Sequence, residues 1–170
     1  MQKPNALRIT QITAALFCVT KLALDIFFIM NNQLSLHNLV FGDHISSEDL
    51  PTEIKLALIT EAIIVAAPIG ILAACNYVRL DMKYNRGMLT LLIASVLYII
   101  NITASIITDR ISFSVINSSY GTSTADLTAS VNSIRSLTSF LITAAFIMVF
   151  CCAAIEIYAG KRINEKKIKA

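Results

Sequence analysis

Residues 88–108 have the sequence MLTLLIASVLYIINITASIIT, which contains no charged side chain. In an α-helix that rises about 1.5 Å per residue, this stretch is about 31 Å long. The hydrocarbon core of a bilayer is about 30 Å thick, so the stretch has the length of a transmembrane helix. Three further apolar stretches reach that length, at 7–30, 54–78 and 134–159. The sequence therefore predicts an all-α membrane protein, a four-transmembrane-helix antiparallel bundle.

The residues that flank these stretches predict helices at about 7–30, 52–80, 87–116 and 124–162, all within a single domain of residues 1–170. Apolar residues recur in steps of three and four from Leu127 to Ile155, so the fourth helix begins well before its apolar core. Gly160, which basic residues follow, predicts the end of that helix near residue 162.

Helices three and four are expected to extend beyond the outer face of the membrane as a helical hairpin. Ile111 and Ile116 can continue the apolar face of the third helix past the bilayer. The alternative is a short strand at 112–116, where polar and apolar residues alternate.

The composition supports a membrane location and excludes several classes of protein. The chain has 56% hydrophobic and 15% charged residues, whereas a soluble domain usually has about 25% charged residues. Lys and Arg are not interleaved with aromatic residues, so we expect no nucleic-acid partner. All four cysteines lie inside the apolar stretches, so disulfides between the loops are not expected.

The basic residues are distributed unevenly along the chain. Of the 14 Lys and Arg residues, ten lie before the first span, between spans two and three, or after the fourth. The positive-inside rule then places both termini in the cytoplasm and the loops at 31–53 and 109–133 outside. A plasma membrane or a bacterial cytoplasmic membrane is expected. Lys21 and Asp25 interrupt the first apolar stretch, which argues against a cleaved signal peptide.

Three charged residues, Lys21, Asp25 and Glu61, lie inside the predicted spans. A charge near the bilayer centre costs at least about 2.5 kcal/mol, so such residues normally face protein or a water-filled cavity. Lys21 and Asp25 are four residues apart on one helix and can form an ion pair. Counted from the helix ends, Lys21 and Glu61 lie at a similar depth, about 12–13 Å below the outer boundary. We therefore expect an intramembrane charge cluster, to which Asn101 and Ser105 can add hydrogen bonds.

The charge cluster has two interpretations. A buried ion pair can simply fix the register of the helices. The cluster also has one carboxylate more than it has amines, and a surplus carboxylate that titrates suits a proton- or ion-coupled pathway. A further acidic residue, Glu156, is expected to reach the interface or to pair with Lys161 or Arg8.

The second span carries small residues at every fourth position, which let helix backbones approach closely in lipid. The predicted helix-packing seam, within the bundle or between subunits, consists of Ala62, Ala66, Gly70 and Ala74. Pro68 removes one backbone hydrogen bond from the same helix and predicts a kink there.

No catalytic, cofactor or metal site is expected from the motifs. His37 and His44 share a loop with carboxylates but lack the spacing of a metal site. The favoured hypothesis is a non-catalytic membrane subunit, scaffold or assembly partner. Its partners would be the lipid bilayer and the helices of other membrane proteins or of further copies of itself. The alternative is a small oligomeric channel or ion- or proton-coupled transporter that uses the charge cluster; an enzyme acting on lipid has no nucleophile–base pair to support it.

Overall fold

The structure is a computed structural model that describes residues 2–30, 52–119 and 124–168. Within these ranges the chain forms four helices, namely α1 (Asn5–Met30), α3 (Thr52–Val78), α4 (Tyr84–Ser119) and α5 (Thr124–Ile168). All four are long and apolar enough to cross a membrane. The prediction of an all-α bundle of four such helices is confirmed. The expectations for His37 and His44 fall outside the described residues.

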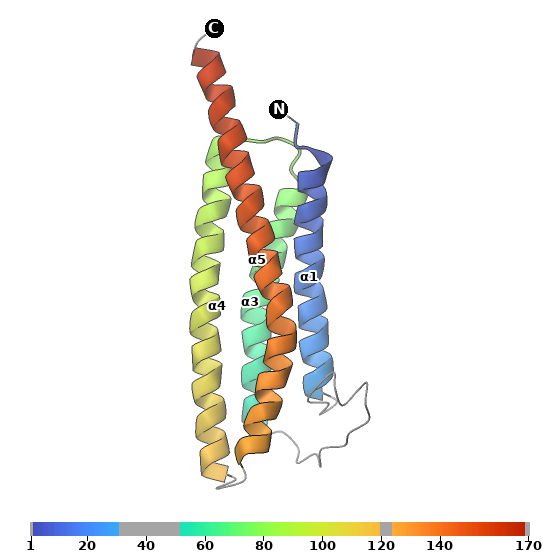
Figure 1. The fold of residues 1–170 in the computed structure, drawn as a ribbon, viewed down its shortest axis with the longest axis vertical. Helices are drawn as coiled ribbons and strands as arrows, with labels where there is room; N and C mark the ends of the chain where they lie inside the picture. The colour runs from blue at the N-terminus through green and yellow to red at the C-terminus, as the bar shows by residue number, and fades with distance from the viewer. Residues whose placement is uncertain (1, 31–51, 120–123, 169–170) are drawn as a thin grey trace.

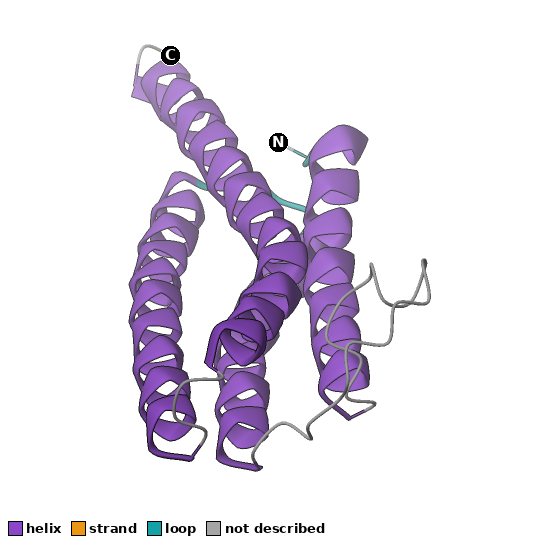
Figure 2. Cartoon of the chain, turned by 60° about the horizontal axis from the view of Figure 1, so that its bottom comes forward, coloured by secondary structure: helices purple, strands orange, loops and turns teal. Residues whose placement is uncertain are grey.

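The helices lie side by side, and helices that follow one another along the chain run in opposite directions (Figure 1). Helix α1 packs on α3 and α5, and α4 packs on the same two helices. The order around the bundle is therefore α1, α3, α4, α5, with α1 and α4 on opposite sides. The connection that the structure describes, residues 79–83 between α3 and α4, is short (Figure 2). The start of α1 and the end of α5 lie at one end of the bundle, which we call the terminal end.

The helix bounds agree with the expected ones within a few residues, with two corrections. Helix α4 continues through residues 112–116, so the alternative of a short strand there is wrong. Thr108 and Ser112, one helical turn apart, are both buried, so the buried polar groups follow the helical period. Whether α4 and α5 project beyond a membrane surface stays a prediction.

The second correction concerns Gly160, which lies inside α5 and does not end it, because the helix continues to Ile168. A Cβ atom on Gly160 would lie 2.5 Å from the backbone nitrogen of Tyr84. At Gly87, a Cβ atom would lie 3.0 Å from the backbone nitrogen of Ile157. These two glycines therefore let the start of α4 contact the backbone of α5 at the terminal end.

Small and apolar side chains form the centre of the bundle. The core includes Ala14 and Cys18 of α1, Ala66 and Ile69 of α3, and Phe146 of α5. A Cβ atom on Gly70 would lie 3.1 Å from Cβ of Cys18, so α1 and α3 are in close contact there. Ala62 and Ala66 of the predicted seam are buried and Ala74 is half-buried. Helix α3 continues through Pro68, and the kink at that residue stays a prediction.

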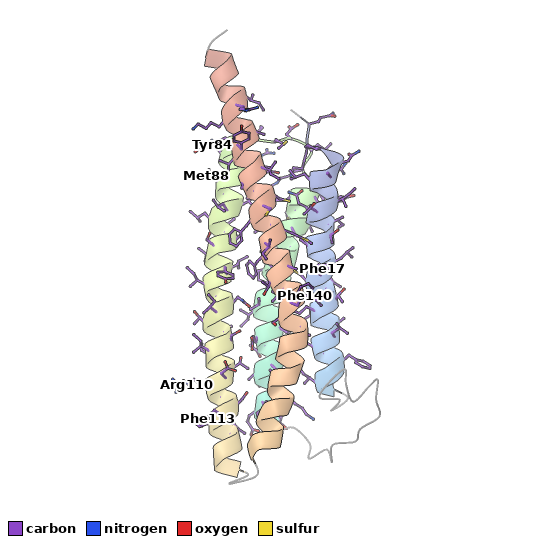
Figure 3. All side chains as sticks on the ribbon, viewed as in Figure 1. Phe17, Tyr84, Met88, Arg110, Phe113 and Phe140 are labelled. Carbon is purple, nitrogen blue, oxygen red and sulfur yellow. The ribbon has the colours of Figure 1, made fainter. Side chains whose placement is uncertain are left out.

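Helix α4 is the least covered of the four. Only 11% of its apolar span is buried, against 28–39% in the other helices. Its outer face carries large exposed apolar residues, among them Leu92, Ile99 and Ile106. Met88 and Phe113 of this helix point away from the bundle (Figure 3). The bundle therefore leaves one long apolar face without a protein neighbour in the described chain.

Candidate functional site

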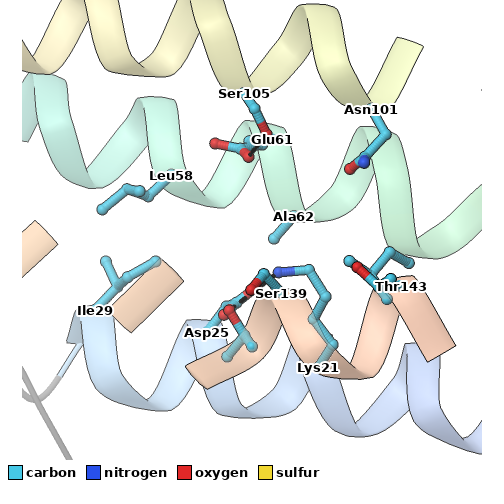
Figure 4. Close-up of a pocket in the computed structure, with 12 residues that line it drawn as sticks. Lys21, Asp25, Ile29, Leu58, Glu61, Ala62, Asn101, Ser105, Ser139 and Thr143 are labelled. Atoms are coloured by element: carbon cyan, nitrogen blue, oxygen red, sulfur yellow. Dashed lines mark hydrogen bonds and ion pairs between the residues drawn. The ribbon is translucent and has the colours of Figure 1, made fainter. Parts of the chain in front are cut away.

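The three charged residues of the predicted spans, Lys21, Asp25 and Glu61, face one cavity of about 230 Å³ that side chains of all four helices line. We call it the charged cavity. Its polar lining includes Lys21 and Asp25 of α1, Glu61 of α3, Asn101 and Ser105 of α4, and Thr138 of α5. Figure 4 shows Glu61 and Ser105 across the cavity from Lys21 and Asp25. The structure therefore brings the predicted cluster residues, and both expected polar neighbours, to the same space.

Lys21 and Asp25 form the ion pair that their spacing predicts. The Nζ atom of Lys21 donates to Oδ2 of Asp25 at 2.7 Å and to Oγ1 of Thr138 at 3.2 Å. Residues four apart on a helix share one face, so α1 alone brings the two charges together. The contact with Thr138 joins this pair to α5.

Asp25 also has an unsatisfied oxygen. The residue is 4% exposed, and its Oδ1 atom is buried with no hydrogen-bond partner among the described residues. Leaving a buried polar atom unsatisfied costs about 1–3 kcal/mol, and more for a charged group. Because Asp25 lines the charged cavity, a water, a proton or a cation inside the cavity can satisfy this oxygen.

Glu61 belongs to the opposite wall of the charged cavity. Its Oε1 atom accepts a hydrogen bond from Oγ of Ser105 at 2.8 Å, which joins α3 to α4. The two helices are antiparallel neighbours, so residues 61 and 105 meet at one level although they are far apart in sequence. Ser105 was expected to contribute here, and the structure identifies Glu61 as the group that it contacts.

The charges of the cavity lining favour cations. One ammonium and two carboxylates leave a formal charge of −1 when all three groups are ionised. The hydroxyl groups and the amide of Asn101 add acceptors that suit a proton, a monovalent cation or an organic cation. Within the described residues, no group of three or more His, Cys, Asp or Glu side chains is placed to hold a metal ion.

A second polar cluster lies near the terminal end. Lys3 forms a buried ion pair with Glu156. Its Nζ atom also donates to Oε1 of Gln11 at 3.2 Å and to the backbone oxygen of Asn76 at 2.9 Å. Asn76 in turn is 3.3 Å from the hydroxyl of Thr90 on α4. These five residues, here called the Lys3 cluster, are each at most 6% exposed.

The Lys3 cluster corrects the expectation that Glu156 pairs with Lys161 or Arg8. The backbone nitrogen of Lys3 donates to the backbone oxygen of Leu80 at 2.7 Å, which holds the segment before α1 against the α3–α4 connection. The Lys3 side chain therefore points into the bundle. Arg8 lies over the ring of Tyr77 instead, at 5.0 Å from its centre.

One sequence signal for the Lys3 cluster was available. Asn76 is an amide near the end of an apolar span, and Gln11 lies two turns after Lys3. Polar groups at such positions need partners inside the protein. The identity of those partners depends on how the segment before α1 folds, which the spacing of residues does not predict.

Comparisons of the chain with protein-family models, with curated proteins and with solved structures find no match. The fold and the site nevertheless define a class. The described residues form a bundle of four helices, each of a length and composition compatible with an integral membrane protein, with a cavity between them that charged side chains line.

Proposed function

We propose that this chain is an integral membrane protein whose charged cavity binds a proton or a small cation during ion-coupled transport. The observation that carries the proposal is the cavity itself. Charges that only fix helix register can be packed without free space, whereas a cavity of about 230 Å³ has room for several water molecules. Charged side chains cost free energy within a bilayer and usually mark the path of a proton, an ion or a substrate.

The two carboxylates suit different roles. Asp25 is already engaged in an ion pair, because its Oδ2 atom accepts from the ammonium of Lys21 at 2.7 Å. Glu61 accepts a hydrogen bond from a hydroxyl, and a hydroxyl both donates and accepts. A protonated Glu61 can therefore keep its contact with Ser105 by donating to it. We infer that Glu61 is the group that gains and loses the transported proton or cation.

The proposed orientation follows from the basic residues. With both termini in the cytoplasm, the charged cavity lies in the outer half of the bilayer, because Lys21 is closer to the end of α1 than to its start. A path to the other side then requires a conformational change or assembly with further copies. A small oligomer is the form of transporter that we propose.

Proton flux into proteoliposomes tests this function. We expect acidification of the vesicle interior by wild type under an imposed gradient, and flux at the level of empty vesicles for Glu61→Gln. Glu53→Gln is the matched control, since Glu53 is exposed and lies two turns earlier on the same helix. The control should keep wild-type flux.

The same assay identifies the result that overturns the proposal. If vesicles with the wild-type protein show the same proton, Na⁺ and K⁺ flux as empty vesicles, the cavity does not have this role. Equal flux through the wild-type protein and Glu61→Gln would also contradict the proposal. Helix content and elution in detergent must match between the variants, so that a folding defect is recognised as such.

The second candidate function is the non-catalytic subunit or scaffold, and the uncovered face of α4 favours it. That face is apolar along the whole span and only 11% of the span is buried. A neighbouring helix would contact it through residues such as Ile99. Disulfide cross-linking of Ile99→Cys, in a chain whose native cysteines are replaced, tests for a second copy. Ile147→Cys on the exposed face of α5 is the control.

A further inference from the structure

A groove of about 380 Å³ lies between α3 and α4, and Glu61 belongs to its lining as well as to that of the charged cavity. We call it the side groove. Its walls are mostly apolar and include Leu56, Ala57 and Ile64 of α3, and Ala104 and Ile107 of α4. Leu56, Ile64 and Ile107 are exposed on the outside of the bundle. The side groove therefore faces the medium around the helices, which in a membrane is lipid.

Two small residues create the space. Ala57 and Ala104 face the groove from neighbouring helices, where larger side chains would fill the gap. Thr60 and Thr108 add hydroxyl groups to the same walls, and Glu53 adds a second carboxylate. The groove thus combines an apolar surface with acidic groups, which differs from the uniformly apolar outer face of α4.

Glu61 separates the two spaces. It is the residue that both linings share, and its hydrogen bond to Ser105 joins α3 to α4 at this level. A molecule in the side groove can place a charged group on the same carboxylate that faces the cavity. The charge of that group must be positive, because Glu61 is acidic.

We infer that the side groove binds a lipophilic organic cation that enters from the bilayer and places its charge on Glu61. The apolar walls accept a hydrocarbon or aromatic body, and a volume of about 380 Å³ is in the range of small-molecule sites. The inference rests on the proposed function, since it names the substrate class of the same carboxylate. One bound monocation replaces one proton on Glu61, so the charge of the site is unchanged by the exchange.

Binding of tetraphenylphosphonium to the purified full-length chain in detergent tests the inference. We expect saturable binding to wild type and a loss of affinity of about tenfold or more in Glu61→Gln. Asp81→Asn, at an exposed carboxylate outside the side groove and the charged cavity, is the control and should change the affinity by less than about twofold. Tetraphenylborate has the same shape and the opposite charge, and it should not compete for the site.

A second variant covers the case in which Glu61→Gln does not fold. Ala57→Leu fills the side groove while leaving Glu61 and the charged cavity in place, so it should weaken tetraphenylphosphonium binding about tenfold or more. Ala67→Leu on the same helix, which lines neither space, is the matched control. Proton flux through Ala57→Leu vesicles should persist.

Three results overturn the inference. They are no saturable binding to wild type, equal affinity of wild type and both groove variants, and equal binding of the phosphonium and the borate. The last result would mean that the groove accepts any apolar molecule, such as a lipid acyl chain. If proton flux still depends on Glu61 in those cases, the proposed function stands and the substrate class is wrong.

Discussion

The Lys3 cluster and the charged cavity lie at different levels of the same bundle and use the same chemical groups in different ways. Each contains a lysine–carboxylate ion pair, and each receives side chains from several helices. In the Lys3 cluster the ammonium contacts Glu156, Gln11 and the backbone of Asn76, so its three hydrogens all have acceptors. In the charged cavity, the Oδ1 atom of Asp25 has no hydrogen-bond partner among the described residues, and it lies beside about 230 Å³ of space.

The difference shows how to distinguish a structural from a functional buried charge. A closed cluster with satisfied groups ties helices together and has no room for a ligand. An open cluster with surplus acceptors is packed less tightly, and its free space can hold a ligand. The three predictions that follow test this distinction: the first perturbs the Lys3 cluster, and the second and third perturb the charged cavity.

The largest effect is expected from Lys3→Met. The substitution removes the ammonium and leaves Glu156 buried beside an apolar side chain, which should lower the free energy of unfolding by about 3–5 kcal/mol. Unfolding in mixed micelles, followed by circular dichroism, measures this change. Lys83→Met, at an exposed position of the α3–α4 connection, should have little effect. A Lys3→Met protein as stable as wild type would mean that the cluster contributes nothing to the fold.

A smaller loss of stability is expected from Lys21→Met. Asp25 loses its partner as well, but water in the charged cavity can hydrate the carboxylate, so the loss should be about 1–3 kcal/mol. The same unfolding assay applies. A loss as large as that of Lys3→Met would show that the cavity holds no water, and the contrast between the clusters would then fail.

The smallest effect is expected from Ser105→Ala, which removes one hydrogen bond between α4 and Glu61. The free energy of unfolding should fall by about 0.5–1.5 kcal/mol, and proton flux should continue because the carboxylate remains. Ser95→Ala is the matched control, since the Ser95 hydroxyl bonds to the backbone of its own helix at Leu91. Loss of flux in Ser105→Ala alone would assign the serine a direct part in transport.

The fold could be predicted from the sequence because the signals for it are local. The length and apolarity of each span predict a helix without reference to the rest of the chain. The Lys21–Asp25 pair follows from the helical repeat, and the level of Glu61 follows from the rise per residue. These features of the candidate site needed only the assumption that the helices are antiparallel.

The remaining features depend on contacts between distant parts of the chain. A membrane helix that is apolar on all sides does not reveal which face is buried, so the side groove between Ala57 and Ala104 had no periodic signal. Gly160 resembles a helix stop in sequence, but its role is the contact with Tyr84, which lies 76 residues earlier. The partner of Glu156 depends on the path of the segment before α1, which is held by a bond to Leu80.

The pairing of Lys3 with Glu156 has a consequence for biosynthesis. Lys3 is synthesised before α1, whereas its partner Glu156 lies in α5 and is synthesised after α1, α3 and α4. At roughly 5–20 residues per second, the delay is on the order of ten seconds. During that time Lys3 cannot form its ion pair with Glu156. This end of the bundle therefore reaches its final packing only after the last helix has been synthesised.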